Sequence, residues 1–229
     1  MNYATNRKVL AIAISAALCT VVTSVYAEGW YVGAGVGSSH NGLSNSRVAS
    51  EAASALGNAG YSFNNFGSGL SGGMSDQNST GLKFFGGTQI NRYLSIEGQF
   101  QGLGKTKGQF TGTVDGPEGG SEVSGTSTYE SMGLDIAAVG TLPITKDFSA
   151  FGKLGLMHWR SEMTTNAVVR SLVPTTVSRT DRDNGNDAYY GLGLKYNLNP
   201  IAGLRLEWER SKIRSGNTDF FSANIVFGF

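Results

Sequence analysis

Alternation of apolar and polar residues is the main signal along this chain. From Gly29 onward, apolar side chains recur at every second position in eight separate segments, with small or polar residues between them. The pattern is clearest where Leu204, Leu206 and Trp208 alternate with charged residues. A period of two places successive side chains on opposite faces of a β-strand. The predicted strands span residues 29–37, 80–90, 93–103, 128–142, 148–159, 188–198, 203–210 and 218–229.

The connections between these segments distinguish a membrane barrel from a soluble sandwich, which would show the same alternation. Tight turns are expected at 91–92, 143–147 and 199–202, whereas long polar loops are expected at about 38–79, 104–127 and 160–187. Short turns on one side and long external loops on the other are typical of outer-membrane barrels. The sequence therefore predicts an all-β fold, an eight-stranded antiparallel up-and-down transmembrane β-barrel over residues 28–229.

The last predicted strand carries apolar residues at alternate positions up to the final residue. These are Ile225, Phe227 and Phe229. Outer-membrane barrels commonly end in this way, and the machinery that assembles them recognises the signal. We therefore expect the barrel assembly machinery to be a partner.

Residues 1–27 predict a signal peptide for export. Arg7 and Lys8 precede the uncharged apolar run Val9–Val22, and Ala27 offers a small residue at a cleavage site. The run is shorter than the roughly 20 residues that a membrane-spanning helix needs. Without Arg7 and Lys8, 16 of the 18 basic residues remain against 17 acidic ones. This balance argues against nucleic-acid binding, which needs a basic excess.

The inward face of the predicted barrel collects charged residues of both signs. They are Lys83, Glu97, Asp135, Lys153, Lys195, Arg205, Glu207 and Glu209. An eight-stranded barrel is only wide enough for side chains to fill it, and an isolated buried charge is costly. Four positive and four negative residues thus predict a self-neutralising salt-bridge network that plugs the lumen. The alternative is a gate, in which a pair such as Glu97 and Arg205 opens to pass small ions.

The first predicted loop contains a helical pattern. Between Ser46 and Leu56, the residues Val48, Ala52 and Ala55 recur at helical spacing, and Gly57 follows as a possible C-cap. A short surface helix is predicted, with a disordered segment as the alternative. In the third loop, three arginines could meet anionic lipopolysaccharide, although three aspartates nearly cancel their charge. The arginines are Arg170, Arg179 and Arg182, and the aspartates are Asp181, Asp183 and Asp187.

Catalytic chemistry finds little support in the sequence. The chain has two histidines, His40 and His158, and acyl transfer or hydrolysis usually needs a histidine beside a nucleophile. Ser161 follows His158 by three residues and Asp135 lies on a neighbouring strand, but this spacing matches no lipid-modifying enzyme pattern. The segment 181–187 lacks the glutamate and the regular spacing of a calcium loop. We expect no catalytic residues, no metal and no cofactor.

Four stretches resemble the transmembrane domain of the OmpA family, which includes small OmpX- and opacity-type barrels. They are WYVGAGVGSS (Trp30–Ser39), GGTQINRYLSIEGQF (Gly86–Phe100), LPITKDFSAFGKLGLMHWR (Leu142–Arg160) and YGLGLKYNLNPIAGLRLEWE (Tyr190–Glu209). The resemblance implies an outer-membrane barrel with exposed loops and roles in envelope integrity, adhesion, colonisation or phage reception. It also implies an internal gate at Glu97 and Arg205. The family's fourth-strand lysine falls near Val139, however, and its sixth-strand glutamate falls on Lys195, so the partner charges differ.

The function expected from these patterns is that of a non-enzymatic, monomeric surface barrel in the bacterial outer membrane. Its loops would contact a host surface, phage or envelope components, and its outer wall would contact lipid and lipopolysaccharide. OmpA itself continues into a periplasmic peptidoglycan-binding domain, and this sequence ends at the eighth strand, so that tethering role is not expected. A small gated ion channel and an outer-membrane lipid hydrolase are the alternatives.

Overall fold

The computed structural model describes residues 29–42, 45–63, 69–116, 119–213 and 216–228. The predicted signal peptide, residues 1–27, and Phe229 lie outside these ranges. Within them the chain forms nine strands and one helix, α2 (Asn45–Asn58). The strands are β1 (Trp30–Asn41), β2 (Gly69–Asp76), β3 (Asn78–Asn91), β4 (Leu94–Gly116), β5 (Gly119–Pro143), β6 (Phe148–Arg170), β7 (Thr175–Asn197), β8 (Ala202–Ile213) and β9 (Gly216–Gly228).

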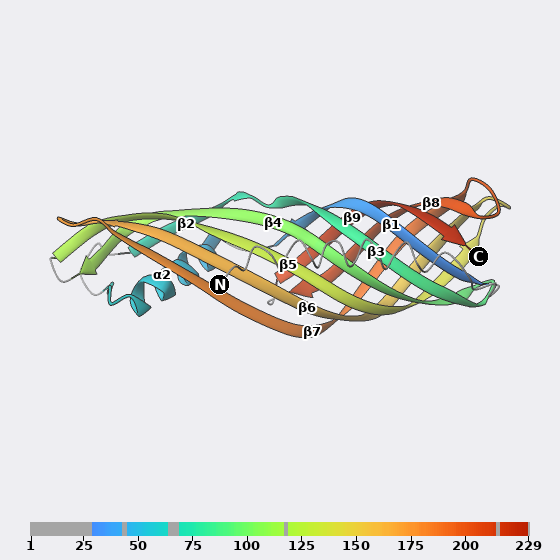
Figure 1. Ribbon diagram of the computed structural model, residues 1–229, viewed down its shortest axis with the longest axis horizontal. Coiled ribbons are helices and arrows are strands. Elements are labelled where there is room, and N and C mark those ends of the chain that lie inside the picture. Colours follow the sequence, from blue (N-terminus) through green and yellow to red (C-terminus); the bar gives the residue numbers. More distant parts are fainter. Residues whose placement is uncertain (1–28, 43–44, 64–68, 117–118, 214–215, 229) are drawn as a thin grey trace, which may run out of the picture.

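Eight of the strands form a closed ring. Neighbours pair antiparallel in the order β4-β3-β1-β9-β8-β7-β6-β5, and β4 also pairs with β5, which closes the ring. Figure 1 shows these strands running obliquely along the long axis of the molecule. Closure leaves no unpaired edge within the barrel, as a sheet in lipid requires. The predicted eight-stranded antiparallel barrel is confirmed.

The barrel wall is apolar outside and polar inside. Leu154, Leu156 and Leu206 are exposed by 60% or more, whereas the inward-facing Lys83 and Glu97 have no exposed surface. A belt of outward leucine, isoleucine and valine around a closed sheet is suited to lipid rather than to water. The predicted faces of the strands are therefore the observed ones.

The prediction of loops at 104–127 and 160–187 is wrong, and the prediction of a loop at 38–79 is wrong in part, because residues 38–41, 69–76 and 78–79 belong to β1, β2 and β3. Residues 104–116 and 119–127 continue β4 and β5, and residues 160–170 and 175–187 continue β6 and β7. The alternation in these parts has the opposite sense, since Phe110, Val114 and Val123 point inward and are buried while threonines and charged residues point outward. The outward faces of these outer strand segments have few of the apolar residues that mark the lipid-facing belt. These segments are therefore difficult to recognise as strands from the sequence.

A β-bulge on β4 separates its two halves. The pairing of β4 with β5 shifts between Gly102 and Lys105, and the buried positions change from odd numbers such as Gln101 to even numbers such as Thr106. Gly104 lies in the bulge with a φ of +77°, and a Cβ there would lie 2.4 Å from the carbonyl oxygen of Thr80. Glycine is required because both the backbone conformation and the space exclude a side chain.

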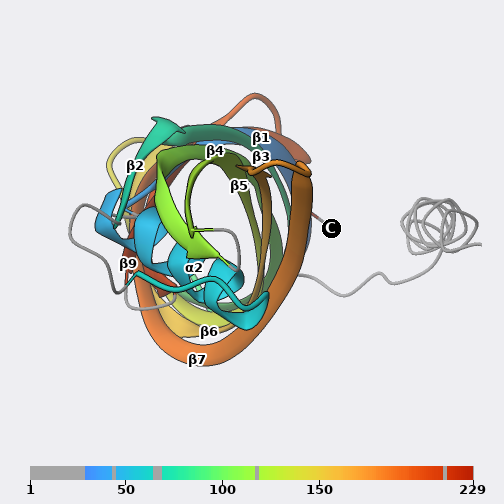
Figure 2. The ribbon, with the colours of Figure 1, turned by 90° about the vertical axis from the view of Figure 1, so that its left-hand side faces the viewer.

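Beyond the bulge, α2 and β2 pack against the outer halves of β4 to β7. We call this part of the molecule the hairpin extension (residues 45–58, 69–76, 104–127 and 160–187). β2 pairs with β4 from Gly69, opposite Thr113, and so takes the place that β3 has in the barrel. Viewed from this end, α2 lies within the ring of strands (Figure 2). The extension is thus a curved sheet that wraps around one helix.

The predicted helix is confirmed, and so are its buried positions. Val48, Ala52, Ala55 and Leu56 are all buried. They pack with apolar residues of the strands: Phe110, Val114, Val123, Ala167 and Val169. The helix ends at Asn58, and the left-handed residue that caps it is Gly60, with a φ of +92°, rather than Gly57; the Tyr61 amide donates to the Leu56 carbonyl. In the described ranges, no helix is long and apolar enough to cross a membrane.

Candidate functional site

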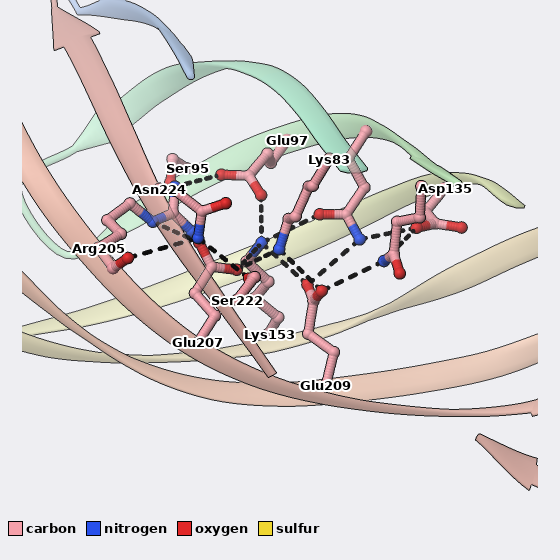
Figure 3. Close-up of polar contacts among 12 residues, drawn as sticks. Lys83, Ser95, Glu97, Asp135, Lys153, Arg205, Glu207, Glu209, Ser222 and Asn224 are labelled. Atoms are coloured by element: carbon pink, nitrogen blue, oxygen red, sulfur yellow. Dashed lines mark hydrogen bonds and ion pairs between the residues drawn. The ribbon is translucent and has the colours of Figure 1, made fainter. Parts of the chain in front are cut away.

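Charged side chains from opposite walls of the barrel meet in the lumen (Figure 3). The Nζ atom of Lys83, from β3, lies 2.5 Å from Oε2 of Glu207 and 2.7 Å from Oε2 of Glu209, both on β8. The Nζ atom of Lys153, from β6, contacts the Glu97 carboxylate on β4 and lies 2.9 Å from Oε2 of Glu207. These ion pairs connect β3, β4, β6 and β8 across the interior of the barrel.

Arg205 completes this set of charges and lies close to two aromatic rings. Its Nη1 donates to Oε2 of Glu97 at 2.7 Å. The guanidinium lies 4.5 Å from the centre of the Phe85 ring and 4.4 Å from that of Phe151. Cation–π contacts of this kind stabilise a desolvated arginine and fix its orientation. We call Lys83, Lys153, Arg205, Glu97, Glu207 and Glu209 the lumen network, in which three cations face three carboxylates.

Two of the eight predicted lumen charges are not part of these ion pairs. The Oδ2 atom of Asp135 accepts hydrogen bonds from Nε2 of Gln99 at 2.7 Å and from Nε2 of Gln101 at 3.0 Å. Lys195 is half-buried near the short-turn end and has no ion pair or hydrogen bond among the described residues. The alternation predicts that Lys195 faces inward. It does not predict how far along the barrel Lys195 lies from the charges that form the ion pairs.

Neutral residues that were not predicted as site residues complete the network. The Tyr31 hydroxyl donates to Oε2 of Glu97 at 3.0 Å. The side-chain amide of Gln99 accepts from Lys153 and donates to Glu209, both at 3.2 Å. These residues alternate with lipid-facing residues on their strands, which is the signal that could have identified them. They provide hydrogen bonds to the buried charges in addition to the ion pairs.

An apolar layer covers the network on the side of the hairpin extension. Leu103, Met157, Tyr189 and Phe220 are exposed by 1% or less, and the layer also contains Tyr129, Ala137, Trp159, Met163 and Ile213. Above it lies the cluster around α2. The lumen is therefore filled in two further layers beyond the charges.

The residues considered for catalysis do not converge. His158 is exposed and its Nδ1 lies 2.8 Å from Oδ1 of Asn186, whereas Ser161 and Asp135 face the interior. His40 similarly meets Asn78 at 3.0 Å. Within the part of the chain that the structure describes, no group of three or more His, Cys, Asp or Glu residues could hold a metal ion.

Each arginine considered for lipopolysaccharide has a carboxylate neighbour. Arg182 lies 2.9 Å from Glu162 and Arg170 lies 3.9 Å from Glu122. Arg179 donates to the neighbouring Asp181 at 2.8 Å, and these hydrogen bonds raise the pKa of its guanidinium above the usual value. The three arginines do not form an uncompensated basic patch.

The tip of the β6–β7 hairpin is apolar although its walls are polar. Leu172 is 89% exposed and Val173 is 69% exposed, in the turn between the two strands. The outward faces of the adjoining strands carry mainly threonine, asparagine and charged residues, with Val168 as an apolar exception. Apolar side chains displayed in this way are typical of contact surfaces.

Comparison with known proteins identifies the family. The model for the OmpA-like transmembrane domain matches residues 26–212. Outer membrane protein A of Salmonella typhi is 29% identical over 147 residues, which are 64% of this chain and 37% of that protein. Its counterpart from Serratia marcescens is 26% identical over 206 residues, 88% of this chain and 48% of that protein. The chain thus spans less than half the length of these relatives.

Two solved structures are among the similar folds. Ail of Yersinia pestis aligns with a TM-score of 0.47 and 15% identity, covering 88% of this chain and 99% of that one. OprG of Pseudomonas aeruginosa aligns with a TM-score of 0.47 and 10% identity, covering 88% and 96%. Since the family match covers most of a chain whose strands close into an eight-stranded barrel, this protein belongs to the family of OmpA-like transmembrane domains and resides in the bacterial outer membrane.

Proposed function

We propose that this chain is a non-enzymatic, monomeric outer-membrane protein that binds partners through its hairpin extension, in adhesion, colonisation or contacts with envelope components. The extension would face the cell exterior and the short turns the periplasm, the asymmetry usual for such barrels. The observation that carries the proposal is that the hairpin extension is folded around its own apolar core at α2 and ends in an exposed apolar tip, Leu172 and Val173.

The hairpin extension presents its tip rigidly. β6 and β7 stay paired from Phe148 opposite Tyr196 to Val169 opposite Thr175, next to the exposed turn. A rigid tip loses little conformational entropy when it binds, unlike a mobile loop. Leu172 and Val173 are therefore the residues that we expect to bury most apolar surface against a partner.

Replacing both tip residues tests this proposal. Cells that display L172S/V173S should bind host-cell monolayers or phage less than cells that display the parent protein, by about thirtyfold if each burial contributes about 1 kcal/mol. Val168→Ser is the matched control, because Val168 lies on the wall of the same hairpin and is 42% exposed. Deleting residues 44–73 removes α2 and most of β2 and tests the rest of the hairpin extension.

Two outcomes would contradict the proposal that the hairpin extension is the binding surface. One is equal binding by the parent, the tip variant and the deletion variant, with the barrel folded in each. The other is an equal loss in V168S and L172S/V173S, which would indicate a general effect of polarity. Folding is checked by the change in gel mobility that a barrel shows on boiling.

We propose that the lumen network acts as a plug. Three cations and three carboxylates lie in the barrel with almost no exposed surface, under a layer of buried apolar side chains. Planar-bilayer recordings should therefore show no conductance beyond rare flickers. Steady channel openings would favour the alternative of a gated channel. Unaltered lipid A in cells that overexpress the protein, checked by mass spectrometry, is the result expected of a protein that is not a lipid hydrolase.

We also propose that the barrel assembly machinery recognises the last strand. Ile225 and Phe227 are about half exposed on the lipid-facing side of β9. Replacing both with serine should lower the amount of folded protein in the outer membrane, measured by gel mobility. An unchanged amount would contradict this role.

A further inference from the structure

A cavity of about 220 Å³ opens at the short-turn end of the barrel, and we call it the vestibule. Among its described lining residues, four are cationic and none is an aspartate or a glutamate. The cations are Arg92, Lys146, Lys195 and Arg205. Since acidic and basic residues are almost equal in number over the whole chain, this lining is a local excess of positive charge. Its volume is enough for one small oxyanion with part of its hydration.

The inner cations of the vestibule lie directly opposite each other. Lys195 on β7 pairs in register with Arg205 on β8, and both line the cavity. Like charges at directly opposite positions destabilise a sheet unless something compensates them. Glu97 and Glu207 compensate Arg205, since they lie 2.7 and 2.8 Å from its nitrogens. The carboxylates of the lumen network are matched by its own three cations, so Lys195 is left without a counter-charge.

Arg205 also has a donor that the network does not use. The side chain is 4% exposed, yet its Nη2 has no hydrogen-bond partner among the described residues. Buried guanidinium donors are normally satisfied by protein, water or ligand. The rings of Phe85 and Phe151 hold the group in place, and Phe151 itself lines the vestibule. An oriented, unsatisfied donor thus lies beside an uncompensated lysine.

We propose that the vestibule binds a phosphate group, held by Lys195 and Nη2 of Arg205, with Arg92 and Lys146 at the rim. A phosphate offers several acceptor oxygens and up to two negative charges, so it can meet both inner cations and still face the rim. A carboxylate offers two oxygens and one charge. The low dielectric constant of the barrel interior strengthens the attraction relative to bulk water. The group could belong to a soluble phosphate or to an inner-leaflet phospholipid headgroup, and the site is independent of the function proposed for the hairpin extension.

The test uses the full chain refolded in an uncharged maltoside detergent that contains no phosphate. Inorganic phosphate is titrated in one arm, and dihexanoylphosphatidylglycerol is added to the same micelles in the other. Binding is followed by NMR of the lysine side chains and by calorimetry. We expect at least one probe to bind, and K195Q to weaken that binding by about tenfold, the effect of one charge-assisted hydrogen bond. The arm with the tighter binding identifies the source of the phosphate group.

Lys212→Gln is the matched control. Lys212 is exposed at the opposite end of β8, so the same loss of charge there should leave binding unchanged. A second variant, K195E, places a carboxylate opposite Arg205; it should abolish binding while the barrel stays folded. The proposal is overturned if neither probe binds, if K195Q and K195E bind as the parent does, or if K212Q weakens binding as much as K195Q.

Discussion

The lumen network predicts that one neutral substitution will destabilise the barrel far more than a similar substitution on its surface. Glu97→Gln removes the carboxylate that Lys153 and Arg205 share. At 2.7 Å and an effective dielectric constant of about 20, one such contact contributes about 6 kcal/mol of gross attraction. Desolvation of Glu97 offsets part of this energy. A net loss of about 3–5 kcal/mol is expected, because the variant leaves an unbalanced positive charge in the lumen.

Glu130→Gln is the control that separates burial from contact distance. Glu130 lies 3.0 Å from Lys105, so the two atoms are as close as in the lumen network, but the side chains are 39% and 54% exposed. Exposed pairs contribute little, and this variant should lose less than about 1 kcal/mol. Lys153→Met added to E97Q restores the charge balance, and the thioether can pack against Phe85. The double variant should therefore lose less than the sum of the single variants, by about 2 kcal/mol.

Urea unfolding in lipid vesicles measures these differences. The three tryptophans, at positions 30, 159 and 208, all lie in barrel strands and report unfolding by fluorescence. Comparable losses in E97Q and E130Q would refute the argument that burial sets the energy. Additive losses in E97Q and K153M would refute the argument from charge balance. Gel mobility shows whether each variant folds before urea is added.

Two further perturbations follow from packing. Leu56→Ala should destabilise the hairpin extension locally by about 2–5 kcal/mol, because Leu56 is fully buried against the strands; hydrogen exchange should accelerate in α2 but not in β8 or β9, and uniform acceleration would contradict this. Gly193→Ala should lower the urea midpoint, because its Cβ would lie 2.2 Å from Cζ of Phe151 and 2.7 Å from the Leu206 carbonyl oxygen. Gly152→Ala, whose nearest neighbour lies 3.6 Å away, should be tolerated, and equal shifts in both variants would count against steric exclusion as the cause.

Most of the barrel could be predicted from the sequence because its alternation has one physical cause. Lipid outside and a crowded lumen inside give apolar and polar faces along every membrane-spanning strand, and residues such as Leu206 and Glu207 mark them directly. The helix in the first connection was predictable for a similar reason, since one face of α2 is buried. For these elements, the local period of apolar residues was sufficient to predict both the type of element and its buried face.

The hairpin extension could not be predicted in the same way. Its strands have small or apolar residues inside and polar residues outside, and glycine, serine and threonine weaken the contrast. Phe110 and Val114 keep inward positions, but the bulge at Gly104 shifts their parity relative to Gln101. A search for apolar residues at every second position, without regard to which face they occupy, could have detected these strands. The position of Lys195 outside the lumen network depends on the register between β7 and β8, which alternation does not determine.

The inward packing of the hairpin extension restricts how its sequence can drift. A mobile surface loop accepts almost any substitution, but here alternate residues on β4 to β7 face α2 or the apolar layer below it. Under immune or phage pressure, changes should therefore accumulate at outward positions such as Thr111, Thr164 and Thr180 and at the hairpin tips. Inward positions such as Phe110 and Ala167 should change only together with their neighbours. Along each strand of the hairpin extension, variable and constrained positions would then alternate, so that every second residue contributes to antigenic variation.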